Sequence, residues 1–154
     1  MGAEFYRDGM ARLRAGDVAE GRRLLEDALR EAPGDTQVMH GLSRALDLSG
    51  ERDRALELLE FVHAKVPVDP EPACDLALSL LERGADARAA QVLTPVLESQ
   101  PEQPRANLYM AMALAMTDPP RARRHTVHAR QSTDPDDRQA AAALDRVLAM
   151  YSER

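Results

Sequence analysis

Three stretches of the chain repeat one pattern: GDVAEGRRLLEDALREAP at 16–33, GERDRALELLEFVHAKVP at 50–67 and GADARAAQVLTPVLESQP at 84–101. Each stretch begins with glycine and ends with proline, and both residues recur every 34 positions. Glycine adopts the left-handed conformation that ends a helix at little cost, whereas proline cannot continue a helix. Each stretch, and each segment between two stretches, is long enough for one helix. The pattern therefore predicts a repeated pair of helices.

The segments after the glycines carry apolar residues at helical spacing. In the first, Val18, Leu25 and Leu29 share one face with the small residues Gly21 and Ala28. The same stripe returns twice, with Ala55, Leu56, Leu59 and Val62, and with Ala89, Val92, Leu93, Val96 and Leu97. One apolar face on each helix indicates helices that pack against their neighbours.

Composition excludes several classes of protein. Alanine and leucine supply 46 of the 154 residues, whereas Val, Thr, Phe and Tyr together supply 19 and Ile and Trp are absent, which rules out an all-β fold. The single cysteine, Cys74, excludes an internal disulfide framework and a cysteine-built zinc site. No apolar run approaches the length of a membrane span, and we expect neither a secretory signal nor membrane insertion.

The net charge and the use of arginine in place of lysine give further expectations. The formal net charge of −6 disfavours attraction to nucleic acid or to an anionic membrane. Lys65 is the only lysine among 20 basic residues, which is typical of a GC-rich coding sequence and favours a bacterial origin. We expect a cytoplasmic protein.

These residues resemble the tetratricopeptide repeat family. The family's pattern of apolar, small, glycine and proline positions is met without gaps by Phe5, Gly9, Gly16, Ala28 and Pro33, by Met39, Leu42, Ser43, Gly50, Ala55 and Pro67, and by Ala73, Leu76, Ala77, Gly84, Ala89 and Pro101. The resemblance implies an all-α fold: a right-handed α-solenoid of antiparallel helix pairs. The implied repeats are 2–35, 36–69, 70–103 and a degenerate 104–135, followed by a capping helix at 136–154.

The fourth repeat departs from the pattern at its turn. Asp118-Pro119-Pro120 replaces the glycine, and a helix is predicted at about 119–131 with Val127 as its only large apolar residue. After Thr133-Asp134-Pro135, a last helix carries a predicted apolar stripe of Ala140, Leu144, Val147, Leu148 and Tyr151. A terminal helix with one polar face would close the exposed core of a solenoid.

In this family the first helices of successive repeats line a concave groove. Carried onto this sequence, the partner-binding groove consists of Tyr6, Met10, Leu13, His40, Arg44, Asp47, Cys74, Leu78, Leu81, Leu108, Tyr109, Met112 and Met116. Most of these are apolar, which predicts an apolar or amphipathic partner segment. The alternative is that some of them face the core. Met112 and Met116 suit either an adaptable surface or a core gap, and Cys74 suits a buried small side chain.

A basic run lies in the predicted helix at 119–131. Arg121, Arg123, Arg124 and Arg130 form a secondary basic patch that could dock an acidic partner or a phosphate. The alternative is an ordinary solvated helix face. His125 and His128 are three positions apart, but they have no acid or cysteine in register, so no metal site is predicted.

The sequence predicts a non-catalytic protein–protein interaction module: an adaptor, an assembly factor or a chaperone-like scaffold. It contains no glycine-rich phosphate loop and no nucleophile paired with a base, and no cofactor is expected. Two alternatives remain open. One is an enzyme or cofactor sensor that uses His40, Arg44, Asp47 and Cys74. The other is a self-association module in which a homodimer covers the groove.

Overall fold

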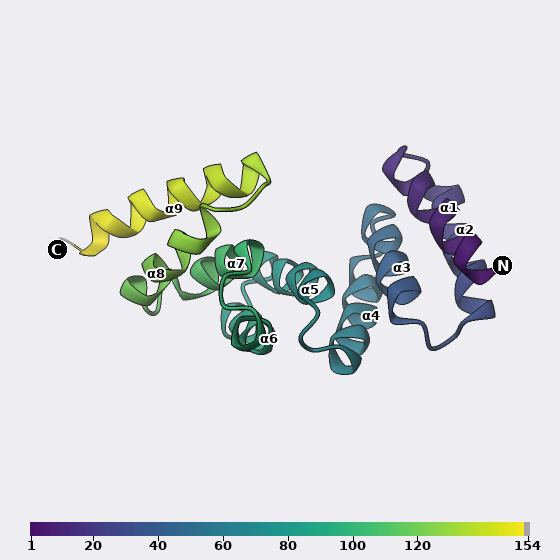
Figure 1. The fold of residues 1–154 in the computed structure, drawn as a ribbon, viewed down its shortest axis with the longest axis horizontal. Coiled ribbons are helices and arrows are strands. Elements are labelled where there is room, and N and C mark those ends of the chain that lie inside the picture. Colours follow the sequence, from purple (N-terminus) through teal and green to yellow (C-terminus); the bar gives the residue numbers. More distant parts are fainter. Residues whose placement is uncertain (153–154) are drawn as a thin grey trace. The chain divides into compact units, whose positions relative to one another are not determined.

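The computed structural model describes residues 1–152, and over this range it contains helices and no strand (Figure 1). The helices are α1 (Gly2–Arg14), α2 (Val18–Glu31), α3 (Thr36–Leu48), α4 (Arg52–Lys65), α5 (Pro70–Glu82), α6 (Asp86–Ser99), α7 (Pro104–Leu114), α8 (Pro119–Ala129) and α9 (Pro135–Ser152). The predicted all-α class of helical repeats is confirmed.

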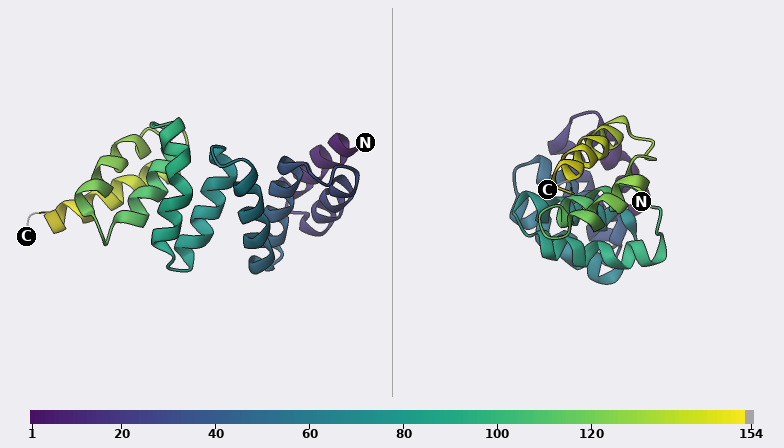
Figure 2. Two further views of the ribbon diagram at one scale, coloured as in Figure 1. Left: turned by 90° about the horizontal axis from the view of Figure 1, so that it is seen from below. Right: turned by 90° about the vertical axis from the view of Figure 1, so that its left-hand side faces the viewer.

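The helices fall into two compact units. The first unit, residues 1–66, contains α1 to α4, and the second unit, from Pro67 onward, contains α5 to α9. Within each unit, helices that follow one another in the sequence pack side by side as antiparallel neighbours (Figure 2). In the second unit α5 also lies against α7, and α9 lies against both α7 and α8. Each unit is therefore a stack of helix pairs.

The glycine turns end the first helix of each regular pair in the same way. Gly16, Gly50 and Gly84 have φ of 84°, 82° and 73°, and they are the only described residues with positive φ. The amide that follows each glycine donates a hydrogen bond of 2.9 Å to the carbonyl five positions earlier, in the helix. This is the Schellman geometry, in which a left-handed residue satisfies the last carbonyls of a helix. The predicted role of the glycines is confirmed.

The fourth turn is built differently. Asp118 donates its amide to the carbonyl of Leu114 at 2.8 Å, and its carboxylate accepts the amide of Arg121 at 3.1 Å. The aspartate thus caps α8 where the other turns use glycine. α8 buries only small residues, Ala122, Thr126 and Ala129, while Val127 is exposed.

The crossing of α1 and α2 depends on two glycines. Gly9 and Gly21 are both buried where the helices meet. A Cβ on Gly21 would lie 2.7 Å from a methyl carbon of Leu13 and 3.0 Å from the carbonyl oxygen of Gly9. The two backbones are therefore too close to accommodate any side chain at this crossing.

Fewer residues of the predicted apolar stripe of α9 are buried against α7 and α8 than the sequence predicts. Ala141 and Leu148 are buried, and Leu148 packs with Ala111 of α7 and Ala122 of α8. Of the predicted stripe, Leu144 is half-buried, whereas Ala140, Val147 and Tyr151 are exposed. The predicted stripe is wrong at those three positions because they do not lie on the side of α9 that packs against α7 and α8.

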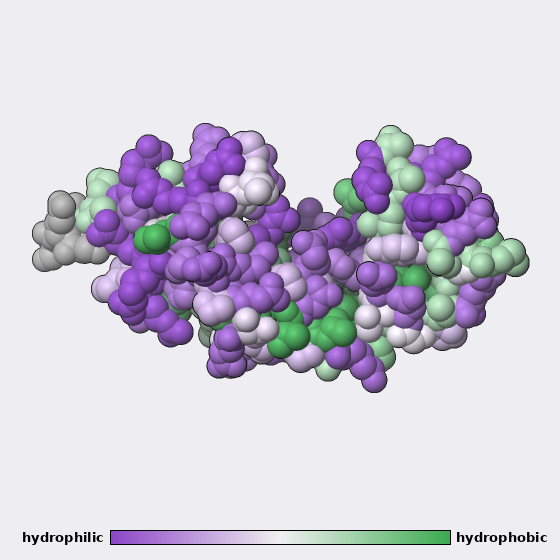
Figure 3. All heavy atoms as spheres, viewed as in Figure 1, coloured by the Kyte–Doolittle hydropathy of each residue, from purple (hydrophilic) through white to green (hydrophobic). Residues whose placement is uncertain are grey.

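The surface of the helices is mainly hydrophilic. On the face that Figure 3 shows, hydrophilic side chains predominate and apolar ones appear in small groups. Single exposed apolar side chains are ordinary on a protein surface, whereas a contiguous apolar patch marks a site of interaction. A candidate binding site is therefore expected where apolar residues of neighbouring helices lie side by side.

Candidate functional site

The candidate site lies on the second unit, where α5 and α7 run side by side. Residues three and four positions apart share one face of a helix. This spacing places Glu71, Cys74, Asp75, Leu78 and Leu81 along α5 and Arg105, Tyr109 and Met112 along α7, and Met116 follows in the turn after α7. We call these two lines of residues the α5–α7 face. Its polar members lie at the beginning of both helices, and its apolar members follow.

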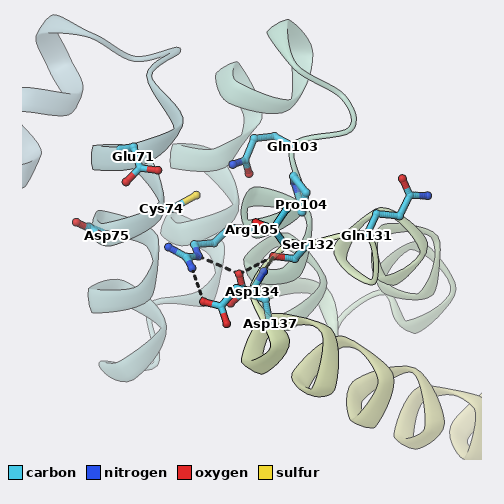
Figure 4. Close-up of a pocket in the computed structure, with 11 residues that line it drawn as sticks. Glu71, Cys74, Asp75, Gln103, Pro104, Arg105, Gln131, Ser132, Asp134 and Asp137 are labelled. Carbon is cyan, nitrogen blue, oxygen red and sulfur yellow. Dashed lines mark hydrogen bonds and ion pairs between the residues drawn. The ribbon is translucent and has the colours of Figure 1, made fainter.

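A pocket of about 320 Å³ occupies the polar end of this face (Figure 4). Its walls come from the start of α5, the start of α7 and the turn that leads into α9. The charged groups that line it are Glu71, Asp75, Arg105, Asp134 and Asp137. The α5–α7 face therefore ends in a strongly polar recess, not in an apolar one.

Arg105 holds this end of the face together. Its Nη2 lies 3.0 Å from a carboxylate oxygen of Asp134, and its Nε lies 3.1 Å from a carboxylate oxygen of Asp137. Asp137 also accepts the hydroxyl of Ser132 at 3.1 Å, and the other oxygen of Asp134 accepts the amide of Asp136 at 2.9 Å. One guanidinium thus joins α7 to the turn before α9 and to the first turn of α9, as the dashed lines of Figure 4 show.

Cys74 and Tyr109 line the same face but stay protonated. Cys74 is 2% exposed, and burial, reinforced by the negative charge of Asp75, raises the pKa of its thiol to about 12. Burial likewise raises the pKa of the half-buried Tyr109 to about 12, although Arg105 acts in the opposite direction. The thiolate is the nucleophilic form of cysteine, so Cys74 does not supply a nucleophile at neutral pH.

We expect native Cys74 to resist alkylation. At pH 8, iodoacetamide should label it at least about a hundredfold more slowly than in urea, because the buried, protonated thiol reacts only when the structure opens. Mass spectrometry of timed samples measures both rates. Equal rates in the folded and the unfolded chain would contradict the burial of this side chain.

Comparison with known proteins identifies the repeats. The sequence model of the tetratricopeptide repeat matches residues 12–74. Residues 12–74 therefore have the sequence of tetratricopeptide repeats. The mouse interferon-induced protein with tetratricopeptide repeats 3 is 47% identical to the chain over 47 residues, which make up 30% of this chain and 12% of that protein. The chain thus spans only a small part of that relative.

Solved structures are similar in fold to nearly the whole length of the chain. TTC0263, a thermophilic tetratricopeptide-repeat protein of Thermus thermophilus, superposes with a TM-score of 0.79, covering 97% of this chain and 83% of its own at 23% identity. MamA of Desulfovibrio magneticus RS-1 superposes with a TM-score of 0.72, covering 99% and 96% at 20% identity. At these identities the likeness concerns the fold, a helical-repeat solenoid.

The predicted groove residues differ in how deeply the structure buries their side chains. Three residues of α1 are half-buried and pack against the core around Leu25 and Leu42: Tyr6, Met10 and Leu13. Cys74 and Leu108 are buried. Leu78, Leu81 and Tyr109 are half-buried, whereas Met112 and Met116 are 40% and 88% exposed.

The polar members of the predicted groove lie on α3 of the first unit. His40 and Arg44 are half-buried, and the exposed Asp47 approaches Arg52 at 3.8 Å. The structure therefore groups Tyr6, Met10, Leu13, His40, Arg44 and Asp47 within the first unit, and Cys74, Leu78, Leu81, Leu108, Tyr109, Met112 and Met116 within the second.

Sequence reasoning missed the polar end of the α5–α7 face. Helical spacing could have placed Glu71 and Asp75 beside Leu78, and Arg105 beside Tyr109, because each pair is three, four or seven positions apart. No local signal connects Arg105 to Asp134 and Asp137, which follow it by about thirty residues.

The predicted basic patch divides into two groups. Arg123 and Arg130 approach the carboxylate of Asp145 on α9, at 3.1 and 3.8 Å. Arg121 and Arg124 face a different pocket together with His125 and His128. Over residues 1–152 no group of three or more histidine, cysteine or acidic side chains is arranged to hold a metal ion. None of the described helices is long and apolar enough to cross a membrane.

Proposed function

We propose that the chain is a non-catalytic adaptor, assembly factor or chaperone-like scaffold that binds an apolar or amphipathic segment of another protein. Tetratricopeptide repeats are in general protein-interaction scaffolds, which supports the general class. The observation that carries the proposal is the apolar half of the α5–α7 face. There Leu78 and Leu81 are half-buried, while Met112 and Met116 remain open to solvent.

The side chains of this half suit a partner segment. Methionine is unbranched and polarisable, so Met112 and Met116 can adapt their shape to a bound apolar side chain. An amphipathic helix or an extended strand would lay its apolar residues on Leu78, Leu81 and Met112. The polar pocket around Arg105 would receive a polar residue of the same segment and thereby fix its direction.

The first unit would contribute a second contact. Tyr6, Met10 and Leu13 of α1 pack against the core with one part of each side chain and leave the other part exposed, and α3 carries the polar residues His40, Arg44 and Asp47. Arginine is enriched among the residues that dominate interface energies, so we assign to Arg44 a polar contact with an acidic residue of the partner.

The chemistry of Cys74 argues against the enzymatic alternative. An enzyme or cofactor sensor built on His40, Arg44, Asp47 and Cys74 would require an accessible thiolate. Burial keeps this thiol protonated, and the other three residues belong to the first unit. Self-association remains a distinct outcome of the experiment below.

Replacement of Leu78 by glutamate tests the proposal. Leu78→Glu places a charge in the middle of the α5–α7 face, and we expect the yield of cross-linked native partners to fall by about tenfold or more. Val127→Glu is the matched control, because Val127 is an exposed apolar residue on α8, outside this face. Circular dichroism should show the same helix content for both variants and the wild type.

Three results would contradict the binding of a partner segment to the α5–α7 face. In the first, the Leu78→Glu variant keeps every partner of the wild type. In the second, the partner's footprint, mapped by hydrogen exchange, lies wholly on α8. In the third, light scattering finds a wild-type dimer that dissociates on Leu78→Glu, which would instead establish self-association through this face.

A further inference from the structure

A second pocket of the second unit is lined by basic side chains. Arg121, Arg124, His125 and His128 follow one another along α8 at intervals of three, one and three, which places them on one face of the helix. They line a pocket of about 290 Å³, whose other walls are Leu97 of α6, Pro101 and Asn107 of α7. We call it the α8 pocket. Every titratable group that lines it is a base.

The two arginines of the α8 pocket differ from their neighbours on the same helix. Arg123 donates to Asp145 at 3.1 Å, and this hydrogen bond holds the pKa of that carboxylate below its usual value. Asp145 also accepts the hydroxyl of Thr126 at 3.2 Å. In contrast, the guanidinium groups of Arg121 and Arg124 make no hydrogen bond or ion pair with any residue of 1–152.

Asn107 orients the first histidine. Its side chain is 1% exposed, and its Nδ2 donates to the carbonyl oxygens of Pro101 and Gln103, both at 2.9 Å. Its Oδ1 can therefore only accept, and it lies 2.7 Å from Nδ1 of His125. Nδ1 of His125 must then carry a proton and donate it to Asn107. Nε2 is therefore the ring nitrogen that can take up or release a proton.

The second histidine has an unsatisfied buried atom. Nδ1 of His128 is shielded from solvent and has no hydrogen-bond partner within the part of the chain that the structure describes. Buried polar atoms are normally hydrogen-bonded, so this ring nitrogen can still form a hydrogen bond. His128 is one of the side chains that line the α8 pocket.

We propose that the α8 pocket binds the phosphate group of a phosphorylated serine or threonine on a partner protein. Such a group carries close to two negative charges and three strong acceptor oxygens, and clustered arginines bind it through charge-assisted hydrogen bonds. Arg121 and Arg124 supply two planar donor groups, and the two imidazole rings supply further donors when protonated. No carboxylate lines the pocket to compete with the phosphate.

Size and charge favour a protein segment over other phosphates. About 290 Å³ lies at the lower end of the range for small-molecule pockets, so a phosphorylated side chain fits better than a nucleotide. Leu97 and Pro101 offer apolar contact to the carbon atoms that carry the phosphate. The net charge of −6 disfavours a polyanion such as nucleic acid, whose affinity requires many basic contacts.

Binding should couple to proton uptake at His125. In the empty pocket, burial, together with the positive charges of Arg121, Arg124 and His128, lowers the pKa of His125. The pocket is also faced by Leu97 of α6, by Asn107 of α7 and by Pro101 between these helices, none of which titrates, and Asp145 of α9 is engaged by Arg123. A bound dianion favours the charged imidazole, so the pKa of His125 should rise on binding.

The experiment uses two synthetic peptides with the full chain. The probe is N-acetyl-Ala-Ala-phosphoserine-Ala-Ala-amide, and its control is the same peptide with serine. In NMR titrations we expect the phosphopeptide to shift the amide signals of α8 and the imidazole signals of His125 and His128 to saturation. The serine peptide should shift neither. At saturation the fitted pKa of His125 should be higher than in sodium chloride of equal ionic strength, while His40 and His63 serve as internal references.

Paired variants show whether the pocket is responsible. Arg121→Gln with Arg124→Gln should weaken phosphopeptide binding by about tenfold or more. Arg14→Gln with Arg146→Gln removes the same charge at exposed positions outside the α8 pocket and outside the pocket around Arg105, and it should leave binding unchanged.

Four outcomes would overturn the proposal. One is the absence of saturable shifts with the phosphopeptide. A second is equal loss of binding in both paired variants, which would indicate a general charge effect. A third is inorganic phosphate binding as tightly as the peptide, which would exclude a protein segment as the source. The last is tighter binding of a single-stranded oligonucleotide, which would assign the pocket to nucleic acid.

Discussion

We expect the variant Gly21→Ala to lower the free energy of unfolding of the first unit by about 1–3 kcal/mol. In an exposed helix the same change would stabilise by about 0.5–1 kcal/mol, because glycine is the more flexible residue. Here the added Cβ would meet the carbonyl oxygen of Gly9 at 3.0 Å. A backbone oxygen cannot rotate away as a side chain can, so α1 would have to move off α2.

Two other glycines of the first unit serve as controls. A Cβ on Gly2 would meet no atom closer than 3.4 Å, so Gly2→Ala should be neutral or slightly stabilising. A Cβ on Gly41 would meet the sulfur of Met10 at 2.9 Å, but that flexible side chain can move, so the cost should be smaller than at Gly21. Urea unfolding, with hydrogen exchange of α1 and α2, measures all three. Equal stability of Gly21→Ala and Gly2→Ala would contradict the close crossing.

The turns of the regular repeats could be predicted because their cause is local. A glycine in the left-handed conformation and a proline beyond the helix end each act on their own neighbours in the sequence. Gly16, Gly50 and Gly84 therefore revealed both the period and the helix ends. The fourth turn lacks this signal, yet Asp118 followed by two prolines still marked where α8 begins.

The face that a helix presents could not be predicted as well, because it depends on neighbours far away in the sequence. Tyr6 and Met10 lie over Gly41 of α3, where the missing side chain leaves room for them. These residues of the predicted groove therefore pack towards the core that α1 shares with α2 and α3. In α9, the position of α7 and α8 selects Ala141 over Ala140, which no local pattern distinguishes.

The ion-pair partners of the charged residues could not be predicted for the same reason. Composition identified a basic run on α8, but only the position of Asp145 on α9 separates Arg123 and Arg130 from Arg121 and Arg124. Ion pairs between residues about twenty or thirty positions apart form only after the helices have packed. The sequence thus predicts that a helix is basic, whereas packing decides which of its bases remain available to a ligand.

Removal of α9 should have the largest effect of any change considered. The helix buries Leu148 to 2% exposure against Ala111 and Ala122, and it contributes Asp137 to the ion pair with Arg105. Without residues 136–154, apolar surface of α7 and α8 would be exposed, and Arg105 would lose one of its two acidic partners. α8 buries only small residues of its own, so it has few large apolar contacts to replace those that α9 supplies.

A single substitution in α9 should cause a smaller loss of stability than removal of the whole helix. Leu148→Ala should lower the free energy of unfolding of the second unit by about 2–4 kcal/mol, because a buried leucine is lost from a packed site. Its neighbour Val147 is 48% exposed, so Val147→Ala on the same helix should change stability by no more than about 0.5 kcal/mol. Urea unfolding measures both variants, and hydrogen exchange shows whether the amides of α7 and α8 lose protection together.

The truncated chain should lose more stability than Leu148→Ala and should associate, because newly exposed apolar patches drive aggregation or dimerisation. Light scattering during concentration detects either result. Stacked repeats gain stability from the interfaces between neighbours, so the loss should be largest in α7 and α8 and smaller in α5 and α6. A monomeric truncated chain with unchanged exchange in α7 and α8 would show that α9 merely rests on the repeats and does not cap them.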